Sequence, residues 1–223
     1  MAGTGGRALV RSIRNKGETG YTHPAGSRRQ QIIKAAAALF VKKGYVKTTV
    51  REIASNSSIT VGTLYHYFSS KDDILSSIQE DTSDFISNLV QKAEETLSQS
   101  GPVESLCLAM RKYFSAVDDV QDTVLFWYHD TGNLQPASQA KLLENDELFG
   151  EVFRKILDAG CQSGVFKQHD TVLMAHDIIV LGDMWAFRRW FLHKHYTFAQ
   201  YAAEQADLIL SAISNNRFSS EKT

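Results

Sequence analysis

The stretch that decides the fold spans residues 48–71 and reads TTVREIASNSSITVGTLYHYFSSK. Residues 49–52 (TVRE) form a capping box, in which the threonine hydroxyl and the glutamate carboxylate each satisfy a free amide at a helix start. That helix is expected to end near Asn56, and after the polar turn at 57–58 a second short helix opens at Thr60. Two short helices joined by a tight turn predict a helix-turn-helix.

Helical patterns flank this motif on both sides. Ser27 is a good N-cap for a helix that runs to Lys43, and Gly44 ends it. Every periodic segment after the motif is also helical, and the segments cover 72–99, 102–118, 122–130, 136–161, 170–194 and 198–214. With no strand alternation, the pattern predicts an all-α fold of about nine helices, with an N-terminal three-helix helix-turn-helix unit and a C-terminal helical bundle.

The charges are distributed unequally along the chain. Residues 1–71 contain twelve Lys or Arg and two Glu, which gives +10, whereas the rest of the chain carries −11. A basic front and an acidic back predict that the front of the molecule binds a polyanion such as DNA.

Several classes of protein are disfavoured. Cys107 and Cys161 match no disulfide or metal framework and are expected to be buried free thiols in a cytoplasmic protein. The apolar run at 178–181 is too short to span a membrane. No nucleophile elbow or glycine-rich phosphate loop is present, so we expect no catalytic residue and no cofactor. A metal site from His129, His176 and an aspartate is conceivable, but no HExxH-like pair exists and none is predicted.

The second short helix has the slim, polar tip that a major groove about 12 Å wide would admit. Gly62 allows close backbone approach, Thr63 can hydrogen-bond, and Val61 can contact a thymine methyl group. Leu64 and Phe68 are four residues apart and are expected to face the core of the unit.

Residues beside the tip suit phosphate oxygens, which position a protein on DNA without reading sequence. Lys71 lies at a helix start, and His66 is expected to face solvent or phosphate. Tyr67 either points outward or packs against the first helix. The predicted DNA-binding residues are Thr49, Arg51, Val61, Gly62, Thr63, Tyr65, His66, Tyr67 and Lys71.

A set of positions spread over about 48 residues forms a longer signature: Ala36, Phe40, Gly44-Tyr45, Thr48–Ala54, Val61–Phe68, Lys71 and Ile74-Leu75. At nearly every signature position, this stretch resembles the DNA-binding domain of TetR-family regulators. The resemblance implies an all-helical homodimer whose first three helices bind double-stranded DNA and whose remaining helices form an effector domain. It also implies phosphate contacts from Thr49, Tyr65 and Lys71. Base-edge contacts are implied for Arg51, Val61, Gly62, Thr63 and Tyr67.

One departure from the family concerns the turn, which usually reads Ala-Gly-Val-Ser and here reads Ser57-Ser58-Ile59-Thr60. The glycine normally takes a left-handed backbone conformation. We therefore expect Ser58 to take it at a cost of about 1 kcal/mol.

The C-terminal half has a second resemblance. The pattern WAFRRW at 185–190, the GVF at 164–166 and Tyr201 are similar to TetR-like repressors of fatty-acid and steroid catabolism, which implies an acyl-CoA thioester as effector. The predicted effector-binding residues are Phe114, Phe126, Trp127, Leu181 and Trp185 for the acyl chain, and Arg188 and Arg189 for the phosphates. Alternatively, the aromatic residues are ordinary core or interface residues and the arginines pair with acids.

The sequence therefore predicts a repressor that a small-molecule effector releases from a palindromic operator, dimerising through its last two helices. An effector-independent regulator, an activator and a helical adaptor protein remain alternatives. The expected segments are a flexible basic arm at 1–26, a helix-turn-helix domain at 27–72, a ligand-binding and dimerisation domain at 73–215, and a disordered tail at 216–223.

Overall fold

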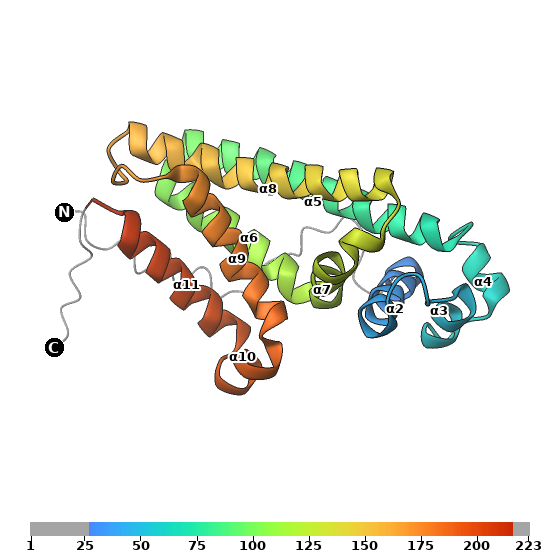
Figure 1. The fold of residues 1–223 in the computed structure, drawn as a ribbon. Helices are drawn as coiled ribbons and strands as arrows, with labels where there is room; N and C mark the ends of the chain where they lie inside the picture. The colour runs from blue at the N-terminus through green and yellow to red at the C-terminus, as the bar shows by residue number, and fades with distance from the viewer. Residues whose placement is uncertain (1–26, 216–223) are drawn as a thin grey trace. The chain divides into compact units, whose positions relative to one another are not determined.

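The computed structural model describes residues 27–215, and within this range every regular element is helical (Figure 1). The elements are α2 (Arg28–Lys43), α3 (Val50–Asn56), α4 (Val61–Tyr65), α5 (Lys71–Ser100), α6 (Pro102–Asp119), α7 (Gln121–Asp130), the 3-10 turn η1 (Thr131–Asn133), α8 (Pro136–Gln162), α9 (Thr171–Phe187), α10 (Arg189–His195) and α11 (Phe198–Ile213). The predicted all-α class is confirmed, with ten α-helices between residues 27 and 215. The predicted arm at 1–26 and tail at 216–223 lie outside the described residues.

Local capping fixes most helix ends where the sequence predicts them. Ser27 Oγ accepts a hydrogen bond from the Gln30 amide at 3.2 Å, and Gly44 ends α2 with a φ of 85°. Thr197 begins α11 in a capping box with Gln200. Because each cap joins residues three or four positions apart, its pattern can be recognised in the local sequence.

One predicted helix is wrong. The segment 170–194 is not continuous, because it breaks at Arg188 (φ −105°, ψ 23°) into α9 and α10. No glycine or proline lies at the break, so the sequence carries no signal that would predict it. The break accompanies tertiary packing, since the Trp185 ring of α9 lies 4.3 Å from the His193 ring of α10 and 5.2 Å from that of Tyr201 on α11.

The described residues form two compact units that alternate along the sequence. The N-terminal unit contains residues 27–87 and 119–147, and the C-terminal unit contains 88–118 and 148–215. The N-terminal unit thus adds the first half of α5, all of α7 and the start of α8 to the helix-turn-helix helices.

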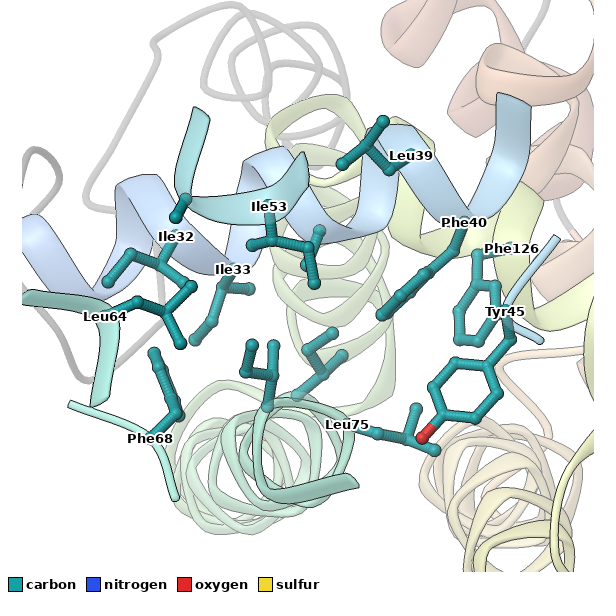
Figure 2. Close-up of a cluster of buried hydrophobic side chains, with 14 of the residues drawn as sticks. Ile32, Ile33, Leu39, Phe40, Tyr45, Ile53, Leu64, Phe68, Leu75 and Phe126 are labelled. Atoms are coloured by element: carbon teal, nitrogen blue, oxygen red, sulfur yellow. The ribbon is translucent and has the colours of Figure 1, made fainter. Parts of the chain in front are cut away.

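The core of the N-terminal unit forms around α2, which contacts both α3 and α7. Ile32, Ile53, Leu64 and Phe68 are almost fully buried in it (Figure 2). The predicted inward orientation of Leu64 and Phe68 is therefore confirmed. This core holds α3 and α4 against α2, so the outer faces of the two short helices are left for a ligand.

Phe126 of α7 also belongs to this core, although the sequence grouped it with effector-binding residues. Its side chain is 0% exposed, and its ring centroid lies 4.9 Å from that of Phe40 (Figure 2). Trp127 packs against the same cluster, with its ring 4.8 Å from Phe126. The structure therefore assigns both rings to the packing of the helix-turn-helix unit, because α7 lies on α2.

In the C-terminal unit, α6 and α9 approach closely at Gly182. A Cβ atom there would lie only 2.7 Å from the Phe114 ring, so a larger residue would push the helices apart. Beside it, Tyr113 donates a hydrogen bond to the buried carboxylate of Asp183 at 2.7 Å. Between residues 27 and 215, no helix combines the length and apolarity that crossing a bilayer requires.

Candidate nucleic-acid interface

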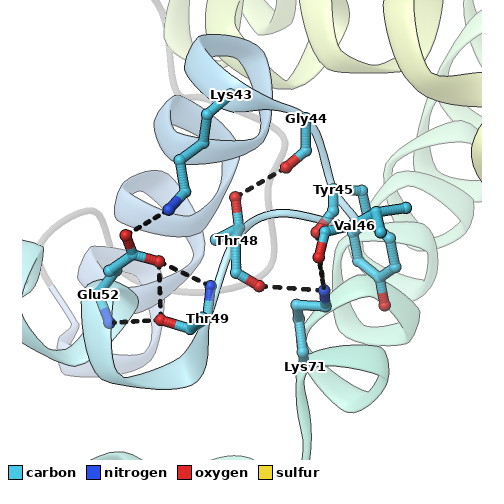
Figure 3. Close-up of polar contacts among 8 residues, drawn as sticks. All are labelled: Lys43, Gly44, Tyr45, Val46, Thr48, Thr49, Glu52 and Lys71. Carbon is cyan, nitrogen blue, oxygen red and sulfur yellow. Dashed lines mark hydrogen bonds and ion pairs between the residues drawn. The ribbon is translucent and has the colours of Figure 1, made fainter.

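The first short helix, α3, begins with the predicted capping box. The Glu52 amide donates to Thr49 Oγ1 at 3.3 Å, and Glu52 Oε2 accepts from the Thr49 amide at 2.9 Å (Figure 3). Lys43, in the last turn of α2, forms an ion pair with the same carboxylate. This pairing and the bonds from Thr49 lower the pKa of Glu52 to about 2. The start of α3 is therefore held both by its own cap and by the end of α2.

The turn between α3 and α4 has the strain that the sequence predicts. Ser58 has a φ of 54°, and it is the one non-glycine residue with a positive φ between residues 27 and 215. The Ile59 amide closes the turn by donating to the Ala54 carbonyl at 3.0 Å. The chain therefore reproduces the turn geometry that the family usually builds with glycine.

The tip of α4 is small and polar. Thr60 Oγ1 accepts from the Thr63 amide at 3.0 Å and lies 2.8 Å from the Thr63 hydroxyl. Gly62 is exposed, and a Cβ atom built on it would meet only Thr60 Oγ1, at 3.8 Å. Internal packing does not require a glycine at this position, so the open surface beside it is available to a ligand.

Four of the predicted DNA-binding side chains point away from the core. Tyr65 is 53% exposed and Tyr67 46%, so Tyr67 takes the outward of its two predicted positions. Arg51 on α3 and His66 after α4 are exposed as well. These side chains give the outer faces of α3 and α4 a cation and several hydrogen-bonding groups.

Lys71, a predicted phosphate contact, has its ammonium group against backbone carbonyl oxygens of the same unit. Its Nζ donates to the carbonyl oxygens of Tyr45 at 2.7 Å, Thr48 at 3.0 Å and Val46 at 3.5 Å (Figure 3). The ammonium group also lies 4.2 Å from the centre of the Tyr45 ring. The charge of Lys71 is thus directed at the turn between α2 and α3.

The sequence did not identify the residues that support this turn. Tyr45 donates its hydroxyl proton to Asp72, and its amide lies 3.5 Å from the carboxylate of Asp130 on α7. Asp130 is buried and also accepts a hydrogen bond from Asn133 at 3.3 Å. Spacing along the chain cannot reveal these partners, because they come from three separate segments.

The predicted effector residues come from both compact units, with Phe126 and Trp127 in the N-terminal unit. Phe114, Leu181 and Trp185 lie in the C-terminal unit on α6 and α9, with Trp185 buried and donating to Asp118 at 2.7 Å. Arg188 is exposed at the break after α9, and its guanidinium lies 5.0 Å from the exposed ring of Trp190. Arg189 follows at the start of α10 and is also exposed. Within 27–215, no three His, Cys, Asp or Glu side chains group as a metal site would require.

Comparison with protein families covers both halves of the chain. A model of the N-terminal domain of bacterial regulatory proteins of the tetR family matches residues 32–78. A model of the tetracyclin repressor-like C-terminal domain matches residues 99–213, which is more than half of the chain.

Individual relatives agree with this result. The HTH-type transcriptional regulator HbdR of Aromatoleum sp. (strain CIB) is 29% identical over 177 residues, covering 79% of this chain and 76% of its own. The structure of the ketosteroid regulator KstR2 of Mycobacterium tuberculosis has a TM-score of 0.68 and 24% identity, covering 88% of this chain and all of that one. AibR, solved with isovaleryl coenzyme A and operator DNA, has a TM-score of 0.63 and 20% identity, covering 82% of this chain and 97% of its own.

Both halves of the fold, the helix-turn-helix geometry and the family matches agree. The chain belongs to the TetR family of bacterial regulatory proteins and is a transcriptional regulator with a helix-turn-helix DNA-binding domain.

Proposed function

We propose that this regulator binds a palindromic operator as a homodimer in the bacterial cytoplasm, represses the adjacent genes, and is released by an acyl-CoA thioester. The proposed binding to the operator is supported mainly by the side chains on the outer face of α3 and α4. There the small tip at Gly62 and Thr63 lies between exposed Arg51 and the half-exposed tyrosines Tyr65 and Tyr67. This combination suits a tip that reads base edges and flanks that bind phosphate.

The residues divide by their chemistry. Thr63 and Arg51 offer hydrogen-bond donors to base edges, and Val61 offers an apolar contact for a thymine methyl group. Tyr65, Tyr67 and His66 offer side-chain donors to phosphate oxygens. Thr49 already uses its hydroxyl within the capping box, donating to Glu52 at 2.7 Å, so its contribution to phosphate binding is small.

The exposed faces of the last long helices support a homodimer. α9 and α11 contact each other, and their exposed residues repeat with a helical period: 172, 173, 176 and 177 on α9, and 200, 204, 207, 208, 211 and 212 on α11. Val172, Leu173 and Leu208 are each more than half exposed. Burial of these apolar side chains against a second copy would give a two-fold symmetric bundle, and two-fold symmetry matches a palindromic operator.

The chemistry of the C-terminal unit supports a thioester effector. Phe114, Leu181 and Trp185 supply apolar surface for an acyl chain, and exposed Arg188 and Arg189 supply the cations that phosphates prefer. AibR, with the same fold, was solved with an acyl-CoA and its operator. α5 is one continuous helix with residues in both units, so we expect an effector to shift α5 and with it the spacing of the two DNA-binding units.

The test is fluorescence anisotropy of the full chain on its own promoter fragment, with short, long and aromatic acyl-CoA thioesters and the matching free acids. Release of DNA by a thioester at micromolar concentration, and not by its free acid, would support the proposal, and Arg188→Gln should weaken that release. Tight DNA binding that no thioester changes would overturn the effector class. A stable dimer that binds no fragment of the genome would indicate an adaptor protein.

A further inference from the structure

The turn between α2 and α3 is fixed to the first residue of α5 by one ammonium group. Lys71 Nζ lies within hydrogen-bond distance of the carbonyl oxygens of Tyr45, Val46 and Thr48, at 2.7, 3.5 and 3.0 Å (Figure 3). A lysine ammonium has three N–H donors and no acceptor. Each of its donors therefore has a backbone acceptor within this turn.

The turn that Lys71 holds sets the direction in which α3 leaves α2. Thr48 donates its hydroxyl proton to the Gly44 carbonyl at 2.9 Å and its amide proton to the Tyr45 carbonyl at 3.2 Å. The next residue, Thr49, is the N-cap of α3. The carbonyl groups that accept from Lys71 thus include that of the residue directly before the N-cap.

Other contacts hold the lysine in this position. Its ammonium lies 4.2 Å from the centre of the Tyr45 ring, a distance typical of a cation–π contact. The hydroxyl of Tyr45 donates to Asp72, the neighbour of Lys71 on α5. Because the three carbonyl groups can engage all three N–H donors, Lys71 would have to give up a contact with the turn to donate to a phosphate.

We propose that Lys71 is a positioning residue for DNA binding, which orients α3 and α4 through the turn at 44–48 instead of binding a phosphate. The proposal rests on the DNA-binding function of the family. A residue that binds phosphate would contribute equally to the affinity for specific and for random DNA. The loss of each such contact would make the slope of log affinity against log salt concentration shallower by about 0.9. A positioning residue instead contributes mainly to the affinity for the operator, because only specific binding depends on the orientation of the tip of α4.

The first experiment compares the wild-type chain with Lys71→Met, which keeps the aliphatic stem and removes the ammonium. Binding to the operator and to random DNA is measured by anisotropy over a range of salt concentrations. We expect operator affinity to fall about tenfold or more and affinity for random DNA to change less than about twofold, with the same salt slope. The charge-matched control is Lys42→Met, an exposed lysine on α2, which should leave the ratio of the two affinities unchanged.

Lys71→Arg separates the two roles without changing charge. An arginine at this position would bind a phosphate well, whereas its planar guanidinium cannot direct three donors at three converging carbonyls. We expect this variant to lose operator affinity while its thermal unfolding remains cooperative. The proposal would be overturned if Lys71→Arg bound the operator with wild-type affinity. It would also be overturned if the salt slope of Lys71→Met became shallower by about 0.9 for each subunit that binds the DNA.

A third measurement needs no DNA, so it also separates this proposal from the proposed repressor function. In Lys71→Met we expect hydrogen exchange at the amides of residues 45–53 to accelerate about tenfold, with exchange in α9 unchanged. Unchanged exchange at 45–53 would refute the positioning role even if the wild-type chain binds its operator. Failure of the wild-type chain to bind any DNA would instead count against the repressor.

Discussion

Gln30 and Asp81 lie 51 residues apart in sequence and meet inside the N-terminal unit, where Gln30 Nε2 donates to Asp81 Oδ2 at 3.0 Å. Arg29 adds an ion pair to the same carboxylate at 3.2 Å. Asp81 is only 5% exposed. The first turn of α2 is thus fixed to α5 by a buried carboxylate, just as the turn after α2 is fixed to α5 through Lys71. Together the two contacts join α2 and the first half of α5 into one body.

Asp81→Ala is expected to lower the free energy of unfolding by about 3 kcal/mol. The substitution leaves the Gln30 amide group buried without this acceptor and Arg29 without its partner. Urea unfolding followed by circular dichroism measures the change. Glu80→Ala, at the exposed neighbouring position, is the control and should change the free energy by less than about 0.5 kcal/mol. Equal effects of the two substitutions would contradict the role of the buried carboxylate.

Ser58→Gly is expected to stabilise the protein by about 0.5–1 kcal/mol. The serine has a φ of 54°, where a side chain is strained and glycine is not. The matched control is Ser55→Gly, at an exposed helical position three residues earlier, which should destabilise the protein by about 0.5 kcal/mol. Opposite signs for the two substitutions in thermal unfolding are the expected result. Destabilisation by Ser58→Gly would mean that the turn is not strained.

Phe126→Ala is expected to lower the free energy of unfolding by about 3–5 kcal/mol, because its ring fills the core between α2 and α7. Its operator affinity should fall as well, since that core supports α3 and α4. Leu143→Ala, at an exposed position in the same unit, should cost less than about 0.5 kcal/mol. If the Phe126→Ala protein is stable and binds DNA normally but no longer responds to its effector, Phe126 belongs to the effector site.

Glu52 is expected to make the start of α3 sensitive to acid. Its pKa is lowered from 4.5 to about 2, first by the hydrogen bond from Lys43 and then by those from Thr49. A lowered folded-state pKa means that the stabilisation is present above pH 4.5 and is lost as the pH falls toward about 2.

Two variants test this dependence on pH. Glu52→Gln keeps an acceptor for the Thr49 amide but carries no charge, and Lys43→Met removes the largest cause of the shift. Both should show a smaller loss of unfolding free energy than the wild type between pH 4.5 and about 2. An identical acid dependence in all three proteins would show that this ion pair does not contribute.

The candidate site could be predicted from the sequence only in part. The apolar spacing of Leu64 and Phe68 predicted that both side chains face the core, and they do. The sequence left two positions open for Tyr67, and only the structure shows that its side chain is 46% exposed. The role of Lys71 could not be derived in this way, because its acceptors are backbone carbonyls at 45, 46 and 48 and carry no side-chain signature. Nor could the position of Phe126, because an aromatic residue on an amphipathic helix suits an effector pocket and a packed core equally well.

By itself, the sequence determined the all-α class and the helix starts at Ser27 and Thr49, and the family resemblance predicted the left-handed turn at Ser58. These features depend on residues within four positions of one another, so the chain encodes them locally. The tertiary structure alone decided the contact of Gln30 with Asp81, the packing of Phe126 on Phe40, the orientation of Lys71 and the helix break at Arg188. Each of these depends on the angle and distance at which separate helices pack, and side-chain packing across the whole unit fixes those quantities.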